Sequence, residues 1–246
     1  MTEAIAIDTS SLRTTCAILY AAARYVPVPF LDDLLREQIT AYLVKRTLTD
    51  QNRRLAPHTM RPLYASDSGC LHGCLAQAFW IPIKLLLFPI RKVLNILLSA
   101  RWVTRDIAET LLFARALDHG IAADLLRDGA DDDAQLARSR ELRQAFDVAL
   151  KGTDTHLLTS LLAAGLGPLR GMITSALRSL RSMRQKKSVE PDVEQTPELA
   201  DRRARIAAVL ARPEVVAFLR EFDTRFRENL AVLAARREGT APAPRG

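Results

Sequence analysis

The densest group of side chains able to do chemistry lies in the six residues from Gly69 to Cys74, which read Gly-Cys-Leu-His-Gly-Cys. Thiols and imidazoles bind zinc, and two cysteines four positions apart share a face of a helix. A zinc site usually adds a second ligand pair, whereas here His58 is the one further candidate that we identify. Cys70, His72 and Cys74 are therefore weak metal candidates. We expect them to pack at the start of a helix, without metal or cofactor, and keep thiol oxidation or lipid modification as the alternative.

Motifs for other chemistry are absent from the sequence, which contains no nucleophile elbow, no Walker phosphate loop and no dinucleotide fingerprint. The aspartates at 131–133 suit the start of a helix, where the helix dipole favours anions. We lean against an enzyme. A helical enzyme would require several scattered groups to converge in one cleft: His58, His72, His119, Cys70, Cys74 and the Asp133 region.

The segment that would position the cysteine cluster is Leu75 to Ala100, the most apolar part of the chain. A lysine at the centre of a membrane-spanning helix costs about 2.5–3.5 kcal/mol, against roughly 0.3–0.6 kcal/mol gained per apolar residue. Lys84 thus removes much of the gain, and Pro82 and Pro89 add to the cost because each removes a helical donor. We do not expect this segment to cross a membrane as a single span.

The polar residues of this segment form one narrow stripe. Gln77, Lys84 and Arg91 recur every seven residues and Asn95 follows four further on, while the rest of the helix surface is apolar. Such a helix is either buried on most sides in a protein core, or embedded among lipid headgroups with its cations on phosphate and Trp80 at the interface. The sequence leaves both interpretations open.

A second hydrophobic region covers residues 156–187. Its leucines lead to Gly165, Gly167, Pro168 and Gly171, where a helix must bend or break, and an amphipathic segment rich in arginine follows. Neither arm of this hairpin reaches the roughly 20 apolar residues of a membrane span.

The lipid interpretation assigns contacts to both regions. The expected membrane-contact residues are apolar: Phe79, Trp80, Ile83, Leu86, Leu87, Phe88, Leu161, Leu162, Leu166, Leu169 and Ile173. The expected phosphate-binding residues are cations that flank them: Lys84, Arg91, Lys92, Arg178, Arg181 and Arg184.

Composition predicts the fold class. The 246 residues are 48 % hydrophobic but only 6 % aromatic, and Ala, Leu and Arg, which favour helix, dominate. We expect an all-α fold, an irregular multi-helix bundle with one long proline-kinked hydrophobic central helix and a second, Gly/Pro-broken hydrophobic hairpin. The expected organisation is a main helical domain at 1–187 with an irregular connector near 50–69, an acidic linker at 188–196, a C-terminal helical segment at 197–236 and a disordered tail at 237–246.

Periodicity and capping residues also predict individual helices. Apart from the apolar segment, which should end near Arg101, they are expected at these ranges: 10–24, 30–49, 104–118, 131–150, 197–212 and 213–236. Gly120 is expected to stop the helix at 104–118.

Charge and cysteine usage suggest a location and partners. The net charge is +7, concentrated in residues 151–188, and the three cysteines indicate a reducing compartment. No secretory signal is visible. We expect a cytoplasmic protein, at the inner face of a membrane if the lipid interpretation holds. We do not expect nucleic acid as a partner, because the basic stripe contains no aromatic residue to stack on a base.

Two function classes remain in view. The leading one is a peripheral, monotopic membrane-associated module that binds or scaffolds on anionic lipid through amphipathic cationic helices. The alternative is a soluble all-α bundle that acts as a protein–protein interaction module, with the helix at 213–236 recognising the partner. The sequence specifies no small-molecule substrate.

Overall fold

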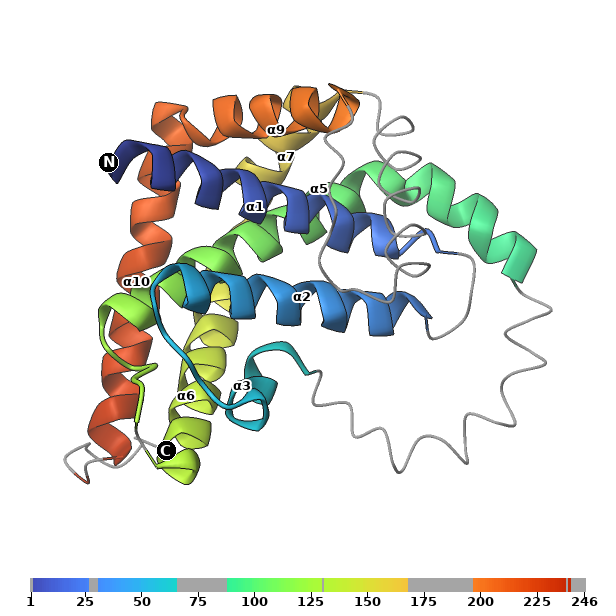
Figure 1. The fold of residues 1–246 in the computed structure, drawn as a ribbon. Helices are drawn as coiled ribbons and strands as arrows, with labels where there is room; N and C mark the ends of the chain where they lie inside the picture. Colours follow the sequence, from blue (N-terminus) through green and yellow to red (C-terminus); the bar gives the residue numbers. More distant parts are fainter. Residues whose placement is uncertain are drawn as a thin grey trace, which may run out of the picture.

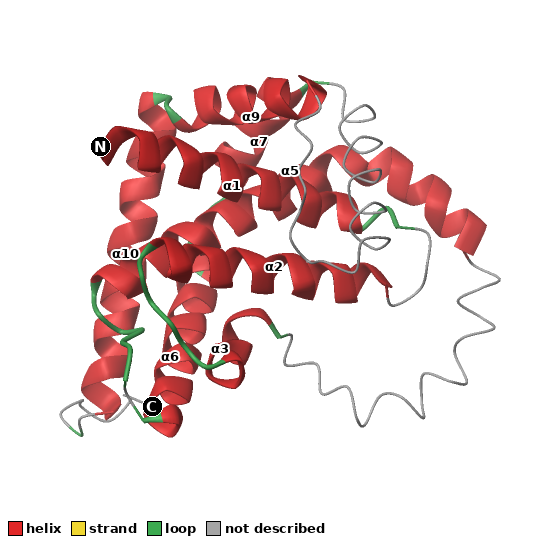
Figure 2. Ribbon diagram, in the orientation of Figure 1, coloured by secondary structure: helices red, strands yellow, loops and turns green. Residues whose placement is uncertain are grey.

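The computed structural model describes residues 2–26, 31–65, 88–129, 131–167, 197–237 and 239. These residues form eight α-helices and no strand, so the predicted all-α fold is confirmed (Figures 1 and 2). The helices are α1 (Thr2–Ala23), α2 (Leu31–Asp50), α3 (Pro57–Tyr64), α5 (Phe88–Ala122), α6 (Asp132–Lys151), α7 (His156–Leu166), α9 (Pro197–Leu210) and α10 (Pro213–Arg237). Residues 66–87 and 168–196 lie outside the described part of the chain.

Helix α5 runs through the bundle and contacts most of the other helices. It packs most extensively on α1 and also contacts α2, α6, α7 and α10. Figure 1 shows it passing behind α1 and α2, with its first turns extending past the ends of both. Pro89 is its second residue, a position where the missing proline N–H is harmless. Residues 88–100 of the apolar segment thus belong to a long helix at the centre of the bundle, whereas residues 75–87, Pro82 included, lie outside the described part of the chain.

The sequence predicts two helices where the structure has one. A break was expected between Arg101 and Thr104, but α5 continues through both for a total of 35 residues. Thr104 is 1 % exposed and lies inside the helix rather than capping one. Burial together with Val103 and Ile107 outweighs the weak helix propensity of threonine.

Gly120 also differs from its predicted role as a helix stop. It is buried inside α5, which ends two residues later, and a Cβ at this position would overlap the side chain of Leu142 on α6. The glycine is therefore explained by a close crossing of two helices.

The connector expected near 50–69 is partly helical. Pro57 is the first residue of α3, a favourable position for proline, and Pro62 lies inside this eight-residue helix. Thr59, Met60 and Leu63 are buried, and α3 packs on α6 and α2. The sequence did not predict this helix, because burial of its side chains stabilises it and no long periodic pattern marks it.

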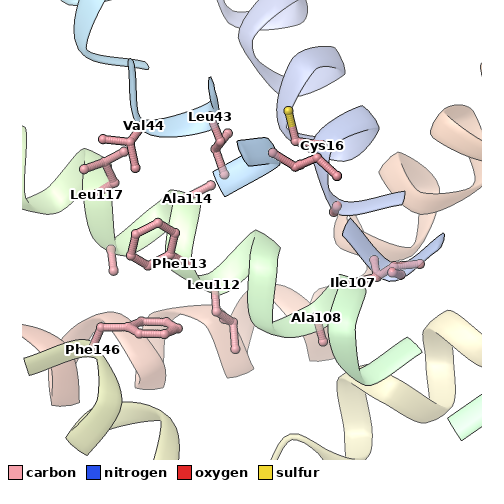
Figure 3. Packing of buried hydrophobic residues seen from close by; sticks show 14 of the residues in the cluster. Cys16, Leu43, Val44, Ile107, Ala108, Leu112, Phe113, Ala114, Leu117 and Phe146 are labelled. Carbon is pink, nitrogen blue, oxygen red and sulfur yellow. The ribbon is translucent and has the colours of Figure 1, made fainter. Parts of the chain in front are cut away.

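The hydrophobic core draws on every described helix. Figure 3 shows Cys16 of α1 and Leu112 of α5 in this buried cluster. Residues of α9 and α10, such as Ile206 and Phe222, belong to the same cluster. Aromatic rings fill its α5–α6–α10 part: Phe113 and Phe146 meet edge to face with centroids 5.3 Å apart, and Phe146 contacts Phe222 in the same way at 6.2 Å. The apolar face of α10 is thus occupied by the protein's own core.

Among the described helices none combines the length and the apolar character needed to cross a lipid bilayer.

Candidate functional site

Most of the sequence-predicted site residues lie outside the described residues. These are the cysteine cluster and the greater part of both hydrophobic regions: Cys70, His72, Cys74, Phe79, Trp80, Ile83, Lys84, Leu86, Leu87, Leu169, Ile173, Arg178, Arg181 and Arg184. Phe88, Arg91 and Lys92 lie in the first turns of α5, for which the structure describes the backbone.

The leucines of α7 do not occupy the surface that the lipid interpretation requires. Leu162 is 0 % and Leu166 1 % exposed, and Leu161 packs partly buried against the same core. Helix α7 lies against α5 and α9, so close to α9 that a Cβ on Gly165 would come within 2.6 Å of Val209 Cγ2. We therefore remove these three leucines from the expected membrane contacts.

The titratable groups considered for an enzyme do not gather in one cleft within the described residues. His58 Nε2 lies 3.1 Å from an Asp132 oxygen on the exposed surface, whereas His119 Nε2 lies 3.0 Å from Asp223 Oδ1 near α10. His156 is exposed at the start of α7. No group of three potential metal ligands occurs in the part of the chain that the structure describes.

A buried carboxylate, Asp106 of α5, joins three helices. Arg24, in the turn directly after α1, donates two hydrogen bonds to it, at 3.0 and 3.1 Å, and Arg36 of α2 donates one at 2.5 Å. The two guanidinium groups also lie over aromatic rings, Arg24 over Trp102 at 5.3 Å and Arg36 over Tyr20 at 4.7 Å. We call these five residues the Asp106 cluster. Burial lowers the pKa of Arg24, but its bonds to Asp106 outweigh this and raise it.

A second set of ion pairs lies further along α5. Arg13 of α1 pairs with Asp118 through contacts of 2.5 and 2.6 Å, and Arg115 makes a bidentate pair with Asp223 of α10 at 2.6 and 2.7 Å. Together with His119, which lies beside Asp223, these residues form what we call the Asp118–Asp223 cluster. It connects α1, α5 and α10.

A pocket opens beside this second cluster. Its volume is about 480 Å³, and four helices line it: Arg13 and Thr14 of α1, Leu111, Arg115 and Asp118 of α5, Leu210 of α9, and Val216, Leu219 and Arg220 of α10. Small-molecule sites typically enclose about 300–1,000 Å³ and combine apolar walls with a few polar groups. The pocket matches that description in both size and lining.

The electrostatics of the pocket favour an anion. Burial raises the pKa of Asp118 above its usual value, although Arg13 opposes the shift. The hydrogen bond to Asp223 raises the pKa of Arg115. Three guanidinium groups line the pocket, whereas Asp118 and the adjacent Asp223 supply two carboxylates, so a single positive charge is left over.

The sequence analysis missed both clusters, although one signal was present. Asp106 is one residue before Ile107 and Asp223 is one residue after Phe222, each within a face that the helical pattern buries. Charged side chains are rarely buried unless they are paired, so an aspartate inside an apolar stripe predicts a cationic partner. It does not predict which of the 35 lysines and arginines that partner is.

The comparisons with known proteins return nothing that bears on this site. No protein-family description matches the chain, and neither curated proteins nor solved structures give a match.

Proposed function

We propose that this protein is a peripheral membrane-binding module that attaches to anionic lipid through the segment from Leu75 to Arg101. The observation that carries the proposal is the geometry of α5, whose first turns extend past the ends of α1 and α2 (Figure 1). That part of α5 carries the sequence from Phe88 to Arg101, which combines apolar residues with Arg91 and Lys92. An amphipathic helix of this composition is suited to the headgroup region.

The rest of the fold supports this use of α5. From Val103 onward the helix is anchored by buried residues and by the Asp106 cluster, so its first turns are held on a rigid body. Each cation near an anionic surface contributes about 1 kcal/mol, which adds to the burial of apolar side chains. No described helix spans a bilayer, which is compatible with attachment to one face.

The rival function, recognition of a protein by α10, has less support. The helix at 213–236 was expected to recognise the partner, but its large apolar residues Phe222, Phe226 and Leu230 are all buried in the protein's own core. The outward side of α10 is largely polar.

Co-sedimentation of the full-length protein with lipid vesicles tests the proposal. The wild type is expected to bind vesicles containing phosphatidylserine, to bind neutral phosphatidylcholine vesicles less, and to release at high salt. Arg91→Glu combined with Lys92→Glu should weaken binding to the anionic vesicles by roughly 30-fold, because about 2 kcal/mol of attraction is lost.

A charge-matched control separates this surface from net charge alone. Lys45 of α2 and Arg140 of α6 are exposed and make no ion pair among those the structure shows for the described residues. The double change Lys45→Glu and Arg140→Glu should leave vesicle binding within about twofold, since it alters only distant charges. Equal loss in both double variants, or wild-type protein that stays in the supernatant with every vesicle, would overturn the proposal.

A further inference from the structure

We propose that the pocket between α1, α5, α9 and α10 binds a small organic monoanion, a carboxylate carried on an apolar body. This site is separate from the membrane-binding segment, and it does not depend on the proposed function. The inference rests on the cations and the apolar side chains that line the cavity together.

The pocket combines charged and apolar groups. Arg13, Arg115, Asp118 and Arg220 are the charged residues of its lining, whereas Leu111, Leu210, Val216 and Leu219 are apolar. Leu111, Arg115 and Asp118 follow one another at helical spacing, so they line a single face of α5. A ligand that uses both kinds of group has one polar end and an apolar remainder.

The charge count identifies the polar end as a single anion. Of the three arginines, Arg13 and Arg115 already neutralise Asp118 and Asp223. Arg220 is exposed on α10 and makes no side-chain hydrogen bond or ion pair among those shown for the described residues. One positive charge without a partner complements a monoanion better than a phosphate dianion, and a guanidinium binds a carboxylate through two parallel hydrogen bonds.

Isothermal titration of the full-length protein with octanoate tests the site, with octanol as the neutral probe of similar length. No vesicles are present, so binding reports a free molecule rather than a lipid headgroup. The wild type is expected to bind octanoate at least tenfold more tightly than octanol, because the alcohol forgoes the charge-assisted bonds.

Two variants locate the binding, and one serves as a control. Arg220→Gln should weaken octanoate binding by about tenfold or more, since it removes the unpaired cation. Val216→Phe should abolish binding by filling the cavity while keeping an apolar side chain on a half-buried position. Arg140→Gln removes an equally exposed arginine from α6 and should leave binding unchanged.

Each other outcome would overturn the inference. Octanoate and octanol binding with equal affinity would mean that no anion site exists. Equal effects of Arg220→Gln and Arg140→Gln would show that only net charge matters. Undiminished binding by Val216→Phe would place the ligand elsewhere, and the absence of heat with wild-type protein and either probe would exclude the site.

Discussion

The Asp106 cluster and the Asp118–Asp223 cluster both connect α5 to its neighbours through arginine–aspartate pairs. They differ in how far their charged groups are shielded from solvent. At Asp106 two arginines share one carboxylate whose side chain is 6 % exposed, and aromatic rings cover both guanidinium groups. At the second cluster each aspartate has a single arginine, Asp118 is 31 % exposed, and a pocket opens beside the pairs. The first arrangement is suited to holding helices together, whereas the second leaves polar groups accessible to a ligand.

Removing the shared carboxylate should have the largest effect. Asp106→Ala leaves Arg24 and Arg36 without a counter-charge and detaches α1 and α2 from α5 at that point. We expect a loss of about 3 kcal/mol in the free energy of unfolding, the lower end of the range for breaking buried pairs, because Arg24 keeps partial exposure. Urea denaturation followed by circular dichroism measures it, and a loss below about 1 kcal/mol would contradict a structural role for this cluster.

Removing Asp223 should cost less and thereby sharpen the comparison. Asp223→Ala breaks the bidentate pair with Arg115, whose side chain is 40 % exposed and can be solvated once it is released. We expect a loss of about 2 kcal/mol in the same urea experiment. Asp201→Ala is the control, because its pair with Arg205 is half exposed and should contribute less than about 0.5 kcal/mol. A larger loss at Asp223 than at Asp106 would reverse our ranking of the two clusters.

The smallest effect is a change in the local opening of α1, for which Cys16 is the reporter. Cys16 is 1 % exposed, and burial raises the pKa of its thiol to about 12, so in the native state it should resist iodoacetamide at pH 8. The folded pKa lies above the ordinary value, hence protection persists through neutral pH and is lost only when the helix opens or the pH approaches that value. Peptide mapping by mass spectrometry separates Cys16 from the other two cysteines.

The two clusters should affect this labelling differently. Asp106 holds the C-terminal end of α1 through Arg24, the residue that follows the helix, whereas the ion pairs of Asp223 in the described structure go to α5. Asp106→Ala should therefore accelerate labelling of Cys16 more than Asp223→Ala does, under native conditions without denaturant. Equal acceleration would indicate that the probe reports global unfolding rather than release of α1.

Local sequence signals predicted some helices well and others poorly. Helices α6, α9 and α10 start where acidic residues or Pro197 and Pro213 mark a first turn, and they were placed within two residues at each end. The predicted helix ends near Arg101, Thr104 and Gly120 were wrong, and so was the irregular connector predicted where α3 lies. In both places burial against other helices determines the structure. Thr104 and Gly120 signal helix ends locally, yet tertiary packing keeps both inside α5.

The pocket could not be predicted from the sequence, again because tertiary packing determines it. Its walls come from four helices, and the pair that borders it joins Arg13 to Asp118, 105 residues apart. Periodicity shows which face of a helix is buried but contains no information about which helix covers it. Nothing in the sequence around Arg13 or Arg220 distinguishes these two arginines from those that line no pocket.

The distance in sequence between α1 and α5 has a consequence for synthesis of the chain on the ribosome. Cys16, Ile18 and Leu19 are fully buried in the finished fold, and α1 packs most extensively on α5, which is translated last among its main neighbours. At about 5–20 residues per second, the 105 residues between Arg13 and Asp118 take roughly 5–20 s to be made. Until then α2 is the one of these two described neighbours available to α1, so the face of α1 that packs on α5 stays uncovered by that helix during synthesis.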